Sequence, residues 1–152
     1  MSQALSYLES PCGVIAMSAD EHGLTSVAFV EHTSQAENPS AVTRRCSSQL
    51  SAYFAGTLTS FDLPLNPQGT AFQQRVWKQL SAIAYGSTAS YGTIAKRLGQ
   101  PTASRAVGMA NGKNPLAIIV PCHRVIGSNG TLTGYAGGLS RKRFLLSLEG
   151  AL

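Results

Sequence analysis

Residues 90–111 of this 152-residue chain read SYGTIAKRLGQPTASRAVGMAN. Ser90 is suited to cap a short helix that runs to Leu98 and is ended by Gly99-Gln100-Pro101. A second short helix, rich in alanine, is predicted from about Thr102 to Asn111. Two short helices joined by a tight, glycine-containing turn are typical of a helix-turn-helix, although any compact helical hairpin has a similar pattern. The small side chains of the second helix would let its backbone approach a partner closely.

Two further helices flank this motif. Thr70 and Gln73 fit a capping box at the start of a helix. Its inward side chains are predicted to be Phe72, Val76, Leu80 and Ile83. A last helix is predicted over residues 140–148, with Phe144, Leu145 and Leu148 inward and with Arg141, Lys142 and Arg143 on a solvated face.

The first half of the chain has the pattern of strands followed by a helix. Apolar or β-branched runs at Leu5–Leu8, Val14–Ser18 and Leu24–Val30 predict three strands, and residues 41–54 have helical spacing. A stretch rich in Pro, Gly, Asn, Thr and Ser, from Gly56 to Gly69, is typical of a linker. We therefore expect an α+β protein with two domains. These are an N-terminal α/β unit over residues 1–66, with an antiparallel three-stranded sheet and a helix, and a C-terminal winged-helix-like helix-turn-helix domain over residues 67–152.

The two halves differ sharply in charge. Residues 1–66 hold two basic and six acidic side chains, whereas residues 67–152 hold ten basic side chains against Glu149 alone. Such an asymmetry indicates a polyanionic partner for the second half, most often a nucleic acid, and the alternative is a solvated basic face. No apolar run approaches the roughly 18 residues of a membrane helix, and the start of the chain lacks the pattern of a signal peptide. Three widely spaced cysteines do not form a disulfide framework, so a cytoplasmic protein is expected.

The second half contains one cysteine, one histidine and one carboxylate, namely Cys122, His123 and Glu149. A cysteine, a base and an acid that orients the base make up an activated nucleophile. A free thiol has a pKa of about 8.5, so it is mostly protonated at neutral pH. We expect His123, Arg124 and the basic surroundings to favour the thiolate. A water between Cys122 and His123 is more plausible than direct contact. The alternative is a small buried cysteine beside a surface histidine.

The sequence around Cys122 favours the interpretation that this cysteine is a reactive nucleophile. Residues 114–127 read NPLAIIVPCHRVIG, and residues 133–138 read TGYAGG. With the segments at residues 90–92 and 104–108 and the terminal LEG at residues 148–150, these motifs resemble the O6-alkylguanine-DNA alkyltransferases, also called methylated-DNA–protein-cysteine methyltransferases. The resemblance extends from Phe72 to Gly150, and the first half matches in layout and size only.

The resemblance implies direct, irreversible and stoichiometric transfer of an alkyl group from O6-alkylguanine in DNA to Cys122, with no cofactor or metal. Whether the protein also repairs O4-alkylthymine stays open. His123 and Glu149 would make the thiolate, Asn114 would brace the turn before Cys122, and Tyr91 would donate a proton to the flipped guanine. The pocket would use the Cys122 and Val125 carbonyls, the Ala136 amide and the Tyr135 ring. Arg105 would replace the flipped base in the minor groove. Further DNA contacts would come from Tyr91, Gly92, Gln100, Ala103 and Ser128.

The resemblance also implies a ribonuclease-H-like N-terminal support domain, a monomer in solution and nucleoid association through DNA; cooperative binding stays open. Serine stands in some relatives where Ala136 stands here, which would narrow the range of adducts. Cys12, His22, His32 and Cys46 are spaced too widely for a compact zinc site. The chain is too short for the sensor domain of the inducible relatives. Two other classes compete with this function: a DNA-binding module without chemistry, and a cysteine hydrolase that releases its acyl group.

Overall fold

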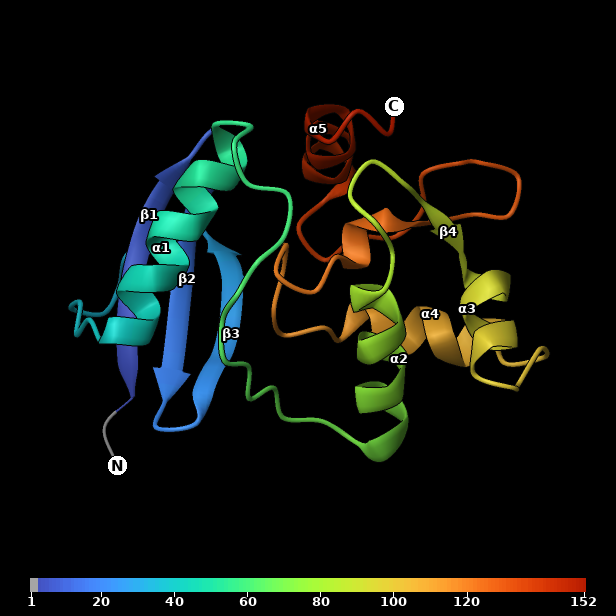
Figure 1. Ribbon diagram of the computed structural model, residues 1–152, viewed down its shortest axis with the longest axis horizontal. Coiled ribbons are helices and arrows are strands. Elements are labelled where there is room, and N and C mark those ends of the chain that lie inside the picture. The colour runs from blue at the N-terminus through green and yellow to red at the C-terminus, as the bar shows by residue number, and fades with distance from the viewer. Residues whose placement is uncertain (1–2) are drawn as a thin grey trace. The chain divides into compact units, whose positions relative to one another are not determined.

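The computed structural model describes residues 3–152, and Figure 1 shows its helices and strands. The chain divides into two compact units, of which one ends at Gln68 and the other begins at Gly69. The first unit contains a three-stranded antiparallel sheet with one helix, and the second is mainly helical, so the α+β class is confirmed. Within residues 3–152, every helix is too short or too polar to cross a bilayer.

The sheet of the first unit is a meander of β1 (Ala4–Ser10), β2 (Gly13–Asp20) and β3 (Gly23–Val30). All three predicted strands are present, and each starts or ends slightly beyond its predicted limits. Cross-strand partners place Ile15, Met17 and Ala19 of β2 on one face, and all three are buried. A β-bulge at Ser18/Ala19 shifts the register of β3, so that Leu24 and Val27 both reach that face despite their odd spacing.

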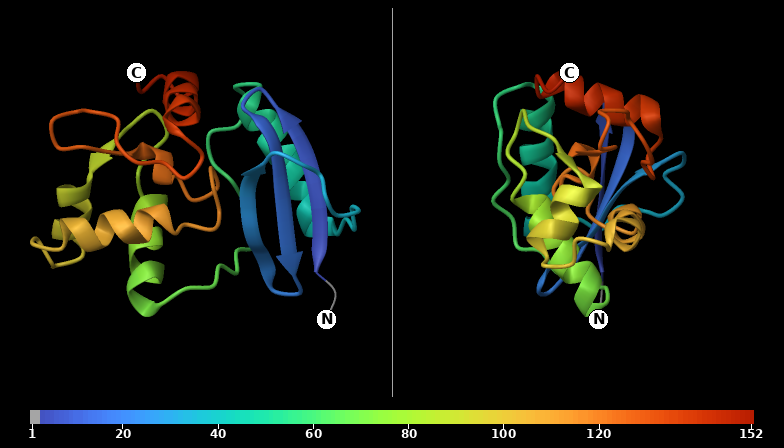
Figure 2. Two further views of the ribbon diagram at one scale, coloured as in Figure 1. Left: turned by 180° about the vertical axis from the view of Figure 1, so that it is seen from behind. Right: turned by 90° about the vertical axis from the view of Figure 1, so that its right-hand side faces the viewer.

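Helix α1 (Ala41–Phe54) covers one face of this sheet, as Figure 2 shows from behind. Ser40 and Thr43 form a capping box, which explains why the helix begins at the predicted residue. The buried side of the helix includes Cys46, Leu50 and Tyr53. Cys46 is therefore a core residue, as its place in the apolar stripe predicts.

The second unit begins with α2 (Ala71–Ser81), and its predicted capping box is confirmed. Thr70 Oγ1 accepts a hydrogen bond from the Gln73 amide at 3.1 Å, and Gln73 Oε1 accepts one from the Thr70 amide at 2.9 Å. Trp77 is buried and its Nε1 donates to the Ala110 carbonyl at 2.9 Å. Phe72, in contrast to the prediction, is only half-buried because it lies at the first turn.

The helix-turn-helix consists of α3 (Tyr91–Arg97) and α4 (Ser104–Gly112). The Ser90 hydroxyl accepts from the Thr93 amide at 3.0 Å, so the predicted cap is present. Helix α4 starts later than the predicted Thr102, and its N-cap residue, Ala103, makes no side-chain cap hydrogen bond. Figure 1 shows the two short helices next to each other, and they pack together.

A two-stranded parallel pair, β4 (Ala89–Ser90) and β5 (Val125–Ile126), links the start of α3 to the segment after Cys122. The chain ends with α5 (Leu139–Leu148). The predicted inward face of this helix is partly wrong. Leu145 is fully buried, but Phe144 is 39% exposed. The buried stripe is instead formed by Lys142, Leu145, Leu146 and Glu149, at the i, i+3, i+4, i+7 spacing of a helix face.

Candidate active site

Cys122 opens a single 3-10 turn, η1 (Cys122–Arg124), directly after a tight buried loop. Leu116, Ile118 and Val120 in that loop are almost fully buried, and the Val120 amide donates to the Leu116 carbonyl at 2.9 Å. Ile118 has a φ of 70°, a left-handed conformation that a β-branched residue rarely adopts. Such backbone strain costs of order 1–3 kcal/mol and persists only where the surrounding structure enforces it. The loop therefore fixes the position of the cysteine at an energetic cost.

The side chain of Asn114 holds this loop closed. Its Nδ2 donates to the Val120 carbonyl at 2.8 Å, and its Oδ1 accepts from the Leu116 amide at 3.0 Å. One amide side chain thus bonds to both ends of the strained loop. A hydrogen bond from Asn114 also acts on the Cys122 thiol and lowers its pKa.

A buried carboxylate connects the end of α5 to η1. Glu149 Oε2 lies 2.7 Å from His123 Nε2, and Glu149 Oε1 accepts from Arg124 Nε at 2.8 Å. Arg124 Nη2 donates to Oε2 at 3.1 Å, so the guanidinium and the carboxylate form a two-pronged pair. The His123 and Glu149 side chains are completely buried, and Arg124 is 7% exposed. Arg124 is thus held in place by its pair with Glu149.

This contact determines which nitrogen of His123 carries the proton. An ionised carboxylate can only accept, and Oε2 already accepts from Arg124, so Nε2 of His123 carries hydrogen and donates it. The other nitrogen, Nδ1, is buried and has no hydrogen-bond partner within residues 3–152. Burial lowers the pKa of His123 and outweighs the hydrogen bond and the charge of Glu149, which raise it. A neutral ring with a lone pair on Nδ1 is an oriented base.

Burial opposes ionisation of the Cys122 thiol, whereas basic surroundings were expected to favour the thiolate. The residue is only 6% exposed, and burial raises the pKa of its thiol. The Asn114 hydrogen bond and the positive charge of Lys142 lower that pKa, in that order, but burial outweighs both. A thiol whose pKa is raised by burial ionises more readily when a neighbouring base accepts its proton.

Lys142 was expected on a solvated face, and this prediction is wrong. Its side chain is fully buried, and its Nζ donates to the carbonyls of Val125, Thr133 and Gly134. Burial lowers the pKa of Lys142 to about 8. A signal in the sequence was available, because Lys142 lies three residues before Leu145 and seven before Glu149, on the same helix stripe.

The remaining predicted pocket residues lie at the start of α3 and in the segments after Cys122. The Tyr91 hydroxyl lies 3.4 Å from Thr133 Oγ1 and 3.5 Å from the Thr133 carbonyl, next to the TGYAGG loop. Val125 is buried, and its carbonyl already accepts from Lys142 at 2.6 Å. Tyr135 is half-buried with a buried phenol oxygen, and Ala136 is exposed.

The residues predicted to contact DNA are exposed or half-buried. Arg105, Ala106 and Met109 form the exposed side of α4, and Met109 is 68% exposed. Gln100 and Ser128 are exposed, whereas Gly92 and Ala103 are half-buried. The outer surface of α4 is thus one arginine, one methionine and otherwise small residues.

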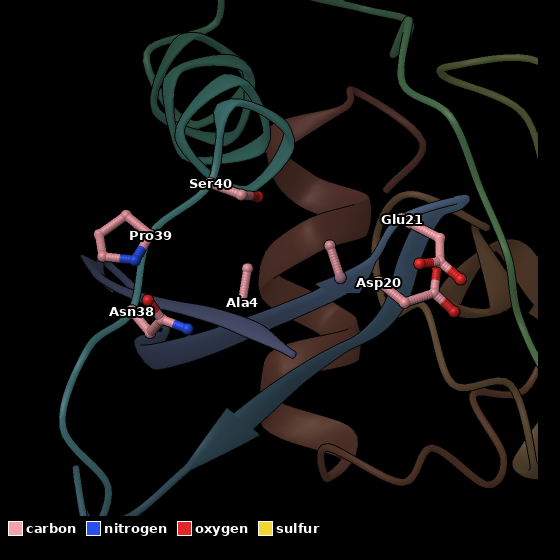
Figure 3. Close-up of a pocket in the computed structure, with 7 residues that line it drawn as sticks. Ala4, Asp20, Glu21, Asn38, Pro39 and Ser40 are labelled. Atoms are coloured by element: carbon pink, nitrogen blue, oxygen red, sulfur yellow. The ribbon is translucent and has the colours of Figure 1, made fainter. Parts of the chain in front are cut away.

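A separate pocket of about 450 Å³ lies in the N-terminal unit, between β1, β2 and the segment that enters α1. Figure 3 shows Asp20 and Glu21 on one side of it and Asn38 and Pro39 on the other. Both carboxylate oxygens of Asp20 are already used: Oδ1 accepts from the amides of His22 and Gly23, and Oδ2 accepts from Asn66. In residues 3–152 no three His, Cys, Asp or Glu side chains gather as metal ligands do.

Comparisons with known proteins cover both units. The sequence pattern of the "6-O-methylguanine DNA methyltransferase, DNA binding domain" matches residues 71–151, and that of the "6-O-methylguanine DNA methyltransferase, ribonuclease-like domain" matches residues 5–67. Together they span nearly the whole chain.

Individual relatives extend this likeness. A protein of Methanosarcina acetivorans named methylated-DNA–protein-cysteine methyltransferase is 56% identical over 149 residues, which cover 94% of this chain and 96% of the relative. The crystal structure of the Mycobacterium tuberculosis O6-methylguanine methyltransferase superposes with a TM-score of 0.88 at 49% identity, covering 99% of this chain and 94% of the other. The M. tuberculosis protein in complex with DNA gives a TM-score of 0.86 at 52% identity, covering 95% and 92%.

The buried cluster around Glu149 predicts a large loss of stability for Glu149→Gln. The substitution keeps the shape of the side chain but leaves the buried Arg124 guanidinium without a counter-charge, which costs about 3–5 kcal/mol of unfolding free energy. Urea unfolding followed by the fluorescence of Trp77, the single tryptophan, measures it in this unit.

Asp62→Asn is the matched control, because Asp62 pairs with Arg45 at 2.9 Å but is 95% exposed. This variant is expected to unfold, by circular dichroism, at nearly the same urea concentration as the unmodified protein. Equal effects of the two substitutions would contradict the special role of the buried carboxylate.

Proposed function

The chain belongs to the family of 6-O-methylguanine DNA methyltransferases, and we propose that it repairs DNA by moving the alkyl group of O6-alkylguanine onto its own Cys122. The observation that carries the proposal is the geometry of His123. Glu149 orients the ring through Nε2 and leaves a buried lone pair on Nδ1, one residue from the only cysteine of the unit.

The proposed reaction starts with proton removal. Nδ1 of His123 takes the thiol proton of Cys122 through a water, because side chains adjacent in sequence seldom meet directly. The resulting imidazolium is stabilised by Glu149. Deprotonation at this moment, rather than at rest, fits a thiol whose pKa is raised by burial.

The sulfur then attacks the alkyl carbon in line with the carbon–oxygen bond. A carbon–sulfur bond forms, the carbon–oxygen bond breaks, and its electron pair stays on the guanine oxygen. The Ala136 amide donates a hydrogen bond to that oxygen, and Tyr91 gives a proton to the guanine ring. Donors aimed at an atom that gains charge in the transition state are where the catalytic benefit is largest. Asn114 keeps the sulfur in place, and Tyr135 packs against the base. The carbonyls of Cys122 and Val125 accept from the guanine amino group.

The substrate reaches this pocket by flipping out of the duplex. The exposed side of α4 lies in the minor groove, where Arg105 fills the space that the base leaves and Ala103 lets the helix approach closely. Gly92, Gln100 and Ser128 contact the DNA backbone. Flipping costs a few kcal/mol and less for a poorly paired base, which favours damaged sites. We propose that the protein acts as a monomer, whose N-terminal unit is a support domain.

The product is a thioether, which has no polarised carbonyl for water to attack. Each molecule therefore accepts one alkyl group and is spent. A cysteine hydrolase, by contrast, forms an ester that water cleaves, and turns over repeatedly.

Mass spectrometry of the intact protein tests the reaction. After incubation with duplex DNA that contains O6-methylguanine, the protein is expected to gain one methyl group per molecule, on the peptide that contains Cys122. Cys122→Ala is expected to lose transfer completely and keep DNA binding. Cys12→Ser, which alters a cysteine of the other unit, is expected to react like the unmodified protein. Turnover beyond one equivalent, or a methyl group on another residue, would reject the proposal.

Arg105→Ala separates base flipping from chemistry. We expect methyl transfer from duplex DNA to slow by roughly tenfold or more, because stabilisation of the flipped state is lost. The reaction with the free base O6-benzylguanine, which needs no flipping, is expected to keep its rate. Single-turnover rates with both substrates measure this.

Arg143→Ala removes the same charge from an exposed position on α5 and serves as the control. If Arg105→Ala slowed both substrates equally, or neither, a role in flipping would be ruled out.

A further inference from the structure

Lys142 is a lysine in the interior of the C-terminal unit. Its side chain is completely buried, which is rare for lysine unless it is paired. It forms no ion pair with a carboxylate among residues 3–152. The described proton-transfer steps do not use it, so the cost of burying its charge needs another explanation.

The ammonium joins two segments of the pocket. Nζ donates to the Val125 carbonyl at 2.6 Å, to the Thr133 carbonyl at 2.5 Å and to the Gly134 carbonyl at 3.3 Å. An ammonium has three protons, so these contacts use all of its donors. Val125 directly follows the 3-10 turn of Cys122, and Thr133 and Gly134 directly precede Tyr135. One side chain therefore clamps the loop that carries the pocket residues to the segment that carries the nucleophile.

The same ammonium interacts electrostatically with the sulfur. The charge of Lys142 lowers the pKa of the Cys122 thiol, and the Cys122 thiolate in turn raises the pKa of Lys142, against burial in both cases. The other ionisable groups packed around these segments are His123 and Arg124 of η1, Glu149 at the end of α5, Tyr91 of α3 and Tyr135 of the loop. Glu149 is bonded to His123 and Arg124, and no hydrogen bond between Lys142 and Glu149 is found among residues 3–152.

We propose that Lys142 is a positioning residue for alkyl transfer, whose ammonium clamps residues 133–134 to Val125 and stabilises Cys122 as the thiolate. The clamp rests on the proposed function, because it positions residues that act in alkyl transfer. The effect of the Lys142 charge concerns the sulfur alone, so it is expected to change the rate at which any small electrophile reacts with Cys122.

The test compares Lys142→Met, which keeps the length of the side chain but removes the charge, with Lys142→Arg, which keeps the charge. Arg143→Met is the matched control, because it removes an exposed positive charge from the next residue of α5. For each variant, the rate of iodoacetamide alkylation at Cys122 is followed as a function of pH by mass spectrometry of the Cys122 peptide. Thermal unfolding verifies that each variant is folded.

Lys142→Met is expected to shift the inflection of the rate profile to higher pH by about one unit and to slow alkylation at neutral pH by roughly tenfold, since one pKa unit is a tenfold change in thiolate. Lys142→Arg and Arg143→Met are expected to keep the inflection of the unmodified protein. An unchanged inflection in Lys142→Met would overturn the proposal, even if the rate were lower, because a purely structural role moves the rate without the pKa.

If Lys142→Met does not fold, Lys142→Gln, which also removes the charge, decides the question: an upward shift of its inflection supports the proposal, and an unchanged inflection would overturn it. Methyl transfer from duplex DNA is measured in parallel with the unmodified protein. Its absence there would reject the proposed function and leave the iodoacetamide profiles to decide the role of Lys142.

Discussion

The reactive segment of this protein depends on one buried carboxylate. Glu149, at the end of α5, bonds to His123 at 2.7 Å and to Arg124 at 2.8 Å, so the last helix and the turn that starts at Cys122 are held as one unit. Burying a carboxylate is costly unless its lone pairs are satisfied, and here a guanidinium and an imidazole satisfy them. The same contact that stabilises the fold also orients the base, because it leaves only Nδ1 of His123 open.

Burial and charge act against each other around the sulfur. Burial raises the pKa of the Cys122 thiol and lowers the pKa of the His123 imidazole, so both shifts favour the uncharged forms. Because the thiolate is the reactive form of a cysteine, the raised pKa of Cys122 lowers the share of reactive sulfur. Asn114 and Lys142 reduce the cost of ionisation without removing it.

Local signals predicted the elements well. The capping boxes at Ser40 and Thr70 mark helix starts that need no tertiary contact, and both helices begin where predicted. The burial of Lys142 was missed because three consecutive basic residues suggest a solvated face, while only packing shows which of them points inward. The upward shift of the Cys122 pKa was missed for a related reason. Burial causes the shift, and the residues next to Cys122 in the sequence do not show how deeply the folded loop buries it.

The most direct measurement of the central claim is an NMR titration of the His123 ring, assigned by comparison with His123→Gln. Because burial outweighs the attraction of Glu149, His123 is predicted to titrate with a midpoint below 6.5 and to be neutral at pH 7. Since the unfolded chain then binds more protons than the folded one, the free energy of unfolding is also expected to fall as the pH drops through 6.5. A midpoint above pH 7 would mean that the ring is mostly charged at neutral pH, and a charged ring has no lone pair with which to accept the proton of Cys122.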